Sequence, residues 1–289
     1  MRLLKLVAIL ALPVVSLSLL ADEFYINNGA DFDASKNSDV AVDQNTTGWV
    51  TELLHKYESN TTAFCSAAEL AGGCDINTSG GADLTSFGAF LSSLGTNGVT
   101  DLSPFDTLDV SGPSDNDYSG SWGITFNFNV EGTIGGSDLV TDYSDGAVVF
   151  YYYDSATLAT GDISTAVVEL FTVDVYGTSN SPGGQILRGF ISSFGSGSIN
   201  GVAITDFFNV RSGTFASVLE NQQDLAVNID YNTDANLVTI NDNGDGTTSL
   251  SGTHDGSVSF AVVPEPFSVA LFGLSLFAIG TLSRKKAIK

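Results

Sequence analysis

Alternating apolar and polar residues recur along much of this chain and constrain its fold more than any other feature. A period of two places every second side chain on the same face, which is typical of a half-buried β-strand. The clearest strands are predicted over residues 124–130, 171–175, 225–231 and 258–262, and further ones over 147–153, 185–194, 202–210 and 237–240.

Clusters of Gly, Asn, Asp and Ser separate these segments. They occupy residues 132–136, 177–184 and 241–246, and residues of these types favour turns. About eight strands with short polar connections predict a mainly β fold, namely an antiparallel β-sandwich or jelly-roll-like body. We place this β domain at residues 116–263.

Residues 22–115 differ from the rest and predict a mixed, partly helical part. Residues 84–94 predict a short helix, and an earlier helix is predicted from apolar residues at helical spacing. These residues are Trp49, Val50, Leu53, Leu54 and Tyr57. The sequence leaves three interpretations of 22–115 open: an α-containing cap, an insertion in the β domain, or a loosely ordered lead.

The end of the chain combines three features in order. Val263-Pro264-Glu265-Pro266 is followed by an apolar run over 267–283 and then by Arg284, Lys285 and Lys286. As a helix the run would be roughly 25 Å long, at the short end of what crosses a bilayer core. The cations favour a cytoplasmic C-terminus, and the two prolines keep the preceding segment extended and open to a protease. We therefore predict one C-terminal transmembrane helix.

This tail resembles the PEP-CTERM sorting signal of Gram-negative bacteria. The resemblance covers residues 263–289 of the 289 and rests on the three features in that order. It implies recognition by an exosortase, a membrane-embedded cysteine transpeptidase-like enzyme, and then release or transfer to the cell surface. The sorting signal would be 264–289, and the membrane would hold the protein only before processing.

The N-terminal residues predict a signal peptide. Arg2 and Lys5 precede an apolar stretch over 6–20, and Ala21 offers a small residue for cleavage before Asp22. Residues 1–21 would then be removed by signal peptidase after passage through the Sec translocon. We therefore expect the body to be exported, with a final location at the cell surface or outside the cell.

The body between the two signals is strongly acidic. Residues 22–263 hold 32 acidic side chains against four basic ones, a formal charge of −28. Such a surface repels nucleic acid, which we exclude as a partner, and anionic lipid. It is compatible with divalent cations and with exopolysaccharide, and acidity that simply keeps an exported protein soluble explains the same composition.

Two cysteines, Cys65 and Cys74, agree with export. In an oxidising compartment they predict one disulfide, which would stabilise the fold by roughly 2.5–3 kcal/mol through closure of a short loop. A redox or metal pair is the alternative, but the pair lacks CxxC spacing and a supporting His.

Aspartate-rich loops are the candidates for calcium binding. Asp242, Asn243 and Asp245 match the start of an EF-hand loop, but its twelfth position is Gly252 and no flanking helices are predicted. A turn between strands 237–240 and 247–250 explains the same residues. Calcium is therefore the one cofactor that the sequence leaves open, here and in the loops at Asp31-Phe32-Asp33 and Asp115-Asn116-Asp117.

Motifs for catalysis are absent from the sequence. It contains no HExxH, GxSxG or Walker loop and only two histidines, His55 and His254. We predict a non-catalytic surface or matrix protein that associates with exopolysaccharide, biofilm or floc. A lectin-like module, calcium-dependent or not, is the main alternative, with Trp122 and Tyr151 to Tyr153 either as binding aromatics or as core packing. A secreted glycoside hydrolase is the third possibility.

Overall fold

A computed structural model describes residues 21–104, 112–136, 139–181, 184–221, 223–231 and 238–263. The Pro-Glu-Pro motif, the predicted transmembrane helix, the basic cluster and residues 1–20 of the predicted signal peptide lie outside these ranges. Within the described ranges, no helix is both long enough and apolar enough to cross a membrane.

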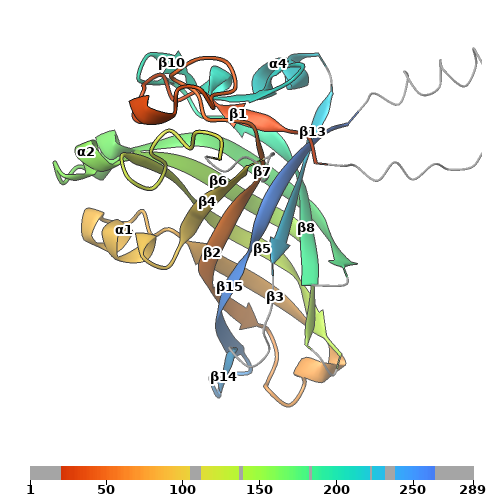
Figure 1. Ribbon diagram of the computed structural model, residues 1–289. Helices are drawn as coiled ribbons and strands as arrows, with labels where there is room; N and C mark the ends of the chain where they lie inside the picture. Colours follow the sequence, from red (N-terminus) through yellow and green to blue (C-terminus); the bar gives the residue numbers. More distant parts are fainter. Residues whose placement is uncertain are drawn as a thin grey trace, which may run out of the picture.

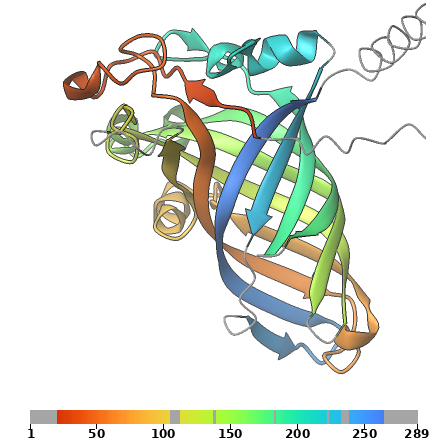
Figure 2. The same cartoon turned by 45° about the vertical axis from the view of Figure 1, so that its right-hand side comes forward.

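The dominant element is one antiparallel sheet in which eight strands form a closed ring (Figure 1). In ring order these are β2 (Val50–Ala63), β3 (Cys74–Gly81), β5 (Trp122–Gly135), β6 (Val140–Asp154), β7 (Val167–Ser181), β8 (Gly184–Phe194), β13 (Asp224–Tyr231) and β15 (Thr248–Val263). β15 returns to β2 and pairs with it from Thr248 opposite Ala63 to Val258 opposite Leu53, so the sheet closes on itself (Figure 2).

The structure confirms the mainly β prediction, but the architecture differs from the expected sandwich. Alternation shows that each strand buries one face, and it does not show whether the buried faces belong to two sheets or to one sheet wrapped around itself. Closure depends on the pairing of β15 with β2, which are almost 200 residues apart in sequence. Strands from 22–115 and from 116–263 therefore share one sheet and one hydrophobic core.

Shorter elements pair with the ring strands or lie at the ends of the ring. β4 (Gly98–Pro104) pairs with the first half of β2, and β14 (Thr239–Asp242) pairs with the start of β15. At the other end of β15 lie β1 (Phe24–Ile26), β11 (Phe208–Val210), β12 (Gly213–Thr214), the pair β9 (Ser198–Ile199) and β10 (Val202–Ala203), and α4 (Phe215–Glu220) (Figure 1). The remaining helices are α1 (Phe87–Leu94), α2 (Ser155–Leu158), α3 (Ile163–Ala166), and the 3-10 turns η1 (Ala34–Lys36), η2 (Leu70–Gly72) and η3 (Ile204–Asp206).

The helix predicted from Trp49 to Tyr57 is wrong, because this segment is the first half of β2. The buried residues from Leu53 onwards alternate, but three of them, His55, Ser59 and Thr61, are polar and hide the period of two. A register shift between Val50 and Glu52 breaks the alternation at the start of the strand. The second helix is confirmed as α1, which Ser86 caps by accepting a hydrogen bond from the Ala89 amide.

Three other expectations need correction. The turn predicted over 177–184 is much shorter, because β7 continues to Ser181 and β8 begins at Gly184. The strand predicted over 202–210 is divided into β10, η3 and β11, which buries Ile204, Phe207 and Phe208 together. The turn predicted over 132–136 begins later, because β5 continues to Gly135. A Cβ at Gly132 would lie 2.1 Å from the Asp142 carbonyl oxygen, so glycine is required there for close approach of β6.

Phenylalanine side chains fill the end of the closed sheet that β1 and α4 cover. Phe24, Phe208, Phe215 and Phe260 pack with centroid distances from 5.0 to 6.2 Å, and Phe171 lies 5.3 Å from Phe208. All five are essentially inaccessible to solvent. This end is therefore solid, and any space for a ligand must lie toward the opposite end.

Candidate functional site

A cavity of about 500 Å³ occupies the interior of the closed sheet. Phe126 and Phe150, whose ring centroids are 5.7 Å apart, line it, and Phe150 also stacks on Phe171 of the phenylalanine-filled end. From there the cavity extends toward Tyr231 at the end of β13. Its volume falls in the range of about 300–1,000 Å³ that is typical of small-molecule sites.

Most of the cavity wall is apolar because alternate residues of each strand face inward. β5 contributes Phe126, Phe128, Val130 and Ile134. The remaining apolar side chains come from five other strands and two connections: Leu139, Val148, Phe150, Leu187, Ile229, Val238, Ile240, Leu250 and Val258. The sequence signal for this wall was therefore the same alternation that predicted the strands.

An irregularity in β6 places polar side chains in the cavity. Glu131 pairs with Asp145 but the next residue, Gly132, pairs with Tyr143, so Ser144 is an extra residue. Val148 and Phe150 face inward on one side of Ser144, and Thr141 and Tyr143 face inward on the other. Strict alternation would have turned Thr141 and Tyr143 outward, which is why the sequence did not indicate them.

The first polar group in the cavity is a chain of three hydroxyls. The Tyr143 hydroxyl donates to Thr78 Oγ1 at 3.0 Å, and the Oγ1 atoms of Thr78 and Thr61 are 2.8 Å apart. The three residues belong to β6, β3 and β2. β3 and β2 are neighbours, whereas β5 lies between β6 and β3, so the Tyr143 side chain reaches across β5 to Thr78. All three side chains are buried and line the cavity.

The second polar group joins β6, β8 and β13. The Tyr231 hydroxyl and the Thr141 hydroxyl both donate to Gln185 Oε1, at 3.0 and 2.9 Å. Gln185 Nε2 donates in turn to the Thr141 carbonyl at 2.6 Å, which fixes the orientation of the amide. The rings of Tyr231 and Tyr143 are 6.1 Å apart, so the two polar groups adjoin.

A third polar contact lies on the wall between β2 and β15. Ser59 Oγ and His254 Nε2 are 2.7 Å apart, and the His254 ring stacks on Tyr57 at a centroid distance of 4.9 Å. All three residues line the cavity.

Among the described residues, the cavity lining contains no Lys, Arg, Asp or Glu, and His254 is its one basic side chain. Burial raises the pKa of the Tyr57, Tyr143 and Tyr231 hydroxyls, so all three stay protonated at neutral pH. The four Lys and Arg residues of the described ranges, Lys36, Lys56, Arg188 and Arg211, are absent from the lining, and so is every Asp and Glu. Within the part of the chain that the structure describes, the lining therefore holds no carboxylate, lysine or arginine, although the protein is strongly acidic.

His55 packs behind the cavity wall, against two residues that line it, and its side chain is neutral at neutral pH. Its ring contacts Tyr57 and Phe126 at centroid distances of 5.6 and 5.5 Å and is 2% exposed. Burial lowers the pKa of His55 to about 4, because a charged imidazolium would lose its hydration there.

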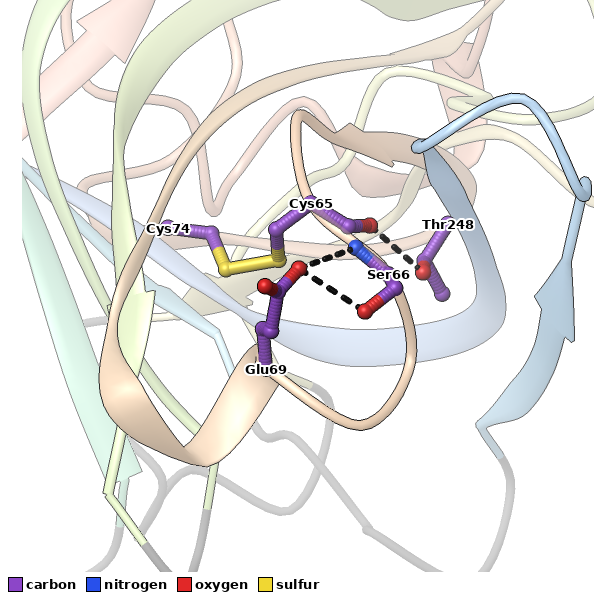
Figure 3. The surroundings of a disulfide bond; sticks show 5 residues. All are labelled: Cys65, Ser66, Glu69, Cys74 and Thr248. Atoms are coloured by element: carbon purple, nitrogen blue, oxygen red, sulfur yellow. Dashed lines mark hydrogen bonds between the residues drawn. A yellow bond between two sulfur atoms is a disulfide. The ribbon is translucent and has the colours of Figure 1, made fainter.

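The disulfide predicted between Cys65 and Cys74 is present, with Cα atoms 6.0 Å apart (Figure 3). Thr248 Oγ1 donates to the Cys65 carbonyl at 2.8 Å and so attaches the loop to the start of β15. Within the loop, the Ser66 amide and hydroxyl both donate to one carboxylate oxygen of Glu69, which lowers the pKa of Glu69. Leu70 of the same loop is buried in the main core, so the loop packs against the end of the ring.

Asp242, Asn243 and Asp245 form the predicted turn between β14 and β15. Asp242 Oδ1 accepts from the Gly244 amide at 2.9 Å, and Asp245 Oδ1 accepts from the Thr247 amide and hydroxyl at 3.0 and 2.6 Å. Among the described residues, no group of three or more His, Cys, Asp or Glu side chains gathers as a metal site would require. The turn is therefore confirmed, and calcium binding by these residues stays a prediction.

The loops at Asp31–Asp33 and Asp115–Asp117 contact each other through an amide. Asn116 Oδ1 accepts from the Phe32 amide at 2.8 Å, and Asn116 Nδ2 donates to Asn28 Oδ1 and the Ala30 carbonyl. A structural role of Asn116 therefore accounts for the proximity of these two acidic loops.

Two of the four candidate carbohydrate-binding aromatics are core residues. Trp122 is fully buried, its Nε1 donates to the Asn116 carbonyl at 2.7 Å, and it stacks on the buried ring of Tyr152. Tyr151 and Tyr153 are half-buried, and the Tyr153 ring contacts Phe90 of α1. Trp122 and Tyr152 therefore cannot form an exposed platform for a sugar.

The residues next to the two predicted processing points lie side by side. Ala21 is exposed, and β15 ends at Val263, directly before Pro264. The Asp22 amide donates to the Phe260 carbonyl at 2.7 Å, and Asp22 Oδ2 accepts from the Val262 amide at 2.6 Å.

Comparisons with protein-family models, curated proteins and solved structures found no match to this chain.

Proposed function

We propose that this chain is an exported, non-catalytic binding protein that holds a small, largely apolar molecule inside its closed sheet. The cavity carries this proposal. Its apolar wall would favour binding by roughly 25 cal/mol for each Å² of apolar ligand surface removed from water. Its few hydroxyls would orient the ligand, as convergent polar groups do in most small-molecule sites.

The export part of the proposal rests on the two ends of the sequence. The predicted signal peptide over 1–21 and the resemblance of 264–289 to a PEP-CTERM sorting signal both support it, and a disulfide suits an oxidising compartment. Association with exopolysaccharide is proposed on that resemblance alone. The lectin-like alternative is less favoured than before, because Trp122 and Tyr152 are buried.

The test is a titration with N-phenylnaphthylamine, an uncharged apolar dye whose fluorescence rises when it leaves water. We expect saturable binding at one site per chain. Val148→Phe, which fills part of the cavity, should weaken it roughly tenfold. Val149→Phe is the matched control, because Val149 follows directly on the same strand and is absent from the lining.

The proposal is wrong if both Phe variants fold and bind the dye as the native protein does. Thermal melts followed by circular dichroism would establish that each variant folds.

Ester hydrolysis is a second candidate, favoured by the 2.7 Å contact between Ser59 Oγ and His254 Nε2. Such a pair can act as nucleophile and base. However, Ser59 lies in the middle of β2 and pairs with Gly80 of β3 and Gly252 of β15. The strand around Ser59 therefore offers no loop of free amides for an oxyanion, and binding is the better supported function. Ser59-dependent turnover of nitrophenyl esters, lost in Ser59→Ala, would reverse this order.

A further inference from the structure

We infer that the cavity selects an uncharged molecule with a hydroxyl head group, of which a long-chain alcohol is the simplest example. This inference rests on the proposed binding function and specifies its ligand class. It follows from how the hydroxyl protons of the lining are used and from the distribution of charge.

The hydroxyl chain of Tyr143, Thr78 and Thr61 retains one proton for a ligand. Three hydroxyls supply three protons, and the chain contains two contacts, Tyr143 to Thr78 at 3.0 Å and Thr78 to Thr61 at 2.8 Å. Each of these two contacts uses one proton, so they leave the third proton uncommitted. Because all three side chains line the cavity, this chain offers a donor to the molecule inside it.

The neighbouring group offers the opposite polarity. Tyr231 and Thr141 both direct their protons to Gln185 Oε1, at 3.0 and 2.9 Å. The two hydroxyl oxygens are also 3.0 Å from each other, so these contacts use both protons, and toward the cavity this group is an acceptor. The Tyr143 and Tyr231 rings are 6.1 Å apart, which brings the donor and the acceptor into one region.

A hydroxyl is the smallest group that satisfies both sides, because it accepts one hydrogen bond and donates another. An ether or a ketone would use the donor alone. A hydrocarbon would use neither, although it would still gain from the apolar wall.

Charged head groups are disfavoured for two different reasons. A carboxylate would be buried without a Lys or Arg partner, since the described Lys and Arg residues are all absent from the lining and His254 is the one basic side chain there, and it would approach a body of formal charge −28. An ammonium would be attracted to that surface but would then lie in a cavity whose described lining residues include no Asp or Glu.

Displacement of bound N-phenylnaphthylamine by dodecanol, dodecanoate and dodecylammonium tests this inference, because the three share one chain and differ in the head group. At mildly alkaline pH we expect dodecanol to bind at least roughly tenfold more tightly than either ion. Equal affinity of dodecanol and dodecanoate at alkaline pH would overturn the inference.

A variant without the hydroxyl chain of Tyr143, Thr78 and Thr61 provides a second test of the inference. The triple substitution Thr61→Val, Thr78→Val and Tyr143→Phe removes all three hydroxyls together, which leaves no member of the chain buried without its partner. We expect dodecanol to lose roughly five- to tenfold in affinity and the dye, which has no hydroxyl, to keep its affinity.

The matched control removes three hydroxyls that do not line the cavity. Thr62→Val, Thr133→Val and Tyr151→Phe change the same residue types on β2, β5 and β6. Dodecanol affinity should be unchanged there, and an equal loss in both triple variants would contradict the inference. Failure of the dye to bind the native protein would overturn the proposed function itself, so the two failures are distinguishable.

Discussion

The Tyr118 hydroxyl bridges two strands that do not pair directly. It donates to the Val99 carbonyl of β4 at 2.8 Å and accepts from the Ile124 amide of β5 at 3.2 Å. Burial raises the pKa of Tyr118 far above its usual value, so the hydroxyl keeps its proton. One side chain thus replaces a backbone contact at the place where β4 lies beside the ring.

Tyr118→Phe should therefore destabilise the protein by about 1–3 kcal/mol, because it leaves a buried carbonyl and a buried amide without this partner. Urea unfolding gives the measurement, with a lower midpoint and an unchanged slope expected. Tyr176→Phe is the control, since Tyr176 is half exposed and stacks on Phe190 through its ring. An equal effect of both substitutions would contradict the bridging role.

His55 should make stability depend on pH. Its pKa is about 4 in the folded protein against 6.5 for an unperturbed histidine, so the unfolded chain binds the proton more readily. The free energy of unfolding therefore has its full value above pH 6.5 and falls as the pH decreases toward 4, by up to about 3 kcal/mol from this residue.

His55→Leu should lack this contribution, and the difference between native and variant unfolding curves isolates it. The groups facing His55 oppose one another in part: Asp255 raises its pKa, as do the backbone groups of Asp230 and Ser257, whereas His254 lowers it. Parallel curves for native protein and variant between pH 4 and 6.5 would show that His55 is not the titrating group.

At the scale of elements, the disulfide loop holds one end of the ring together. Cys65 follows β2, Cys74 begins β3, and the buried Leu70 lies between them in η2. Replacing both cysteines with alanine should lower the free energy of unfolding by roughly 2–3 kcal/mol through the entropy of the unfolded chain. Reductant should lower the unfolding midpoint of the native protein by the same amount and leave the variant unaffected. Equal midpoints for native protein and variant under oxidising conditions would refute this role.

Elements that bury apolar residues at every second position were predictable, and those that bury polar residues were not. β5, β7 and β13 were predicted because Phe, Val, Leu and Ile mark their inward face. β2 was mistaken for a helix because His55, Ser59 and Thr61 occupy inward positions that usually hold apolar side chains. The inward orientation of Thr141 and Tyr143 was not predicted, because the extra residue Ser144 reverses which positions of β6 face inward.

Closure of the sheet could not be predicted from local sequence patterns. The pairing of β15 with β2 joins Thr248 to Ala63, and nothing in either segment specifies the other. The cavity depends on that closure, so the candidate site could not be predicted either. The disulfide could, because composition and compartment determine it without knowledge of the fold.

At the scale of the whole molecule, the two predicted processing points lie at the same end. Asp22 binds Phe260 and Val262 by two hydrogen bonds, next to the end of β15. If the signal peptide and the sorting tail are both removed as proposed, the mature protein should begin at Asp22 and end within 263–266. Intact mass and N-terminal sequencing after expression in an exosortase-containing bacterium would measure both ends.

Glu265→Ala is the control for the C-terminal cut and should retain the tail on membrane-bound protein while the N-terminus stays at Asp22. A native protein that keeps its tail in that host would contradict the sorting interpretation without bearing on the fold.

Ring closure also bears on how many copies of this protein can coexist at high density. Strand edges are the usual templates for fibre growth, and here all eight ring strands have neighbours on both sides, leaving short elements such as β12 and the four-residue β14 at the ends of the hydrogen-bonded order. The −28 formal charge of residues 22–263 adds mutual repulsion. If the protein is exported as proposed, we expect closely packed copies to stay dispersed and not to grow into filaments.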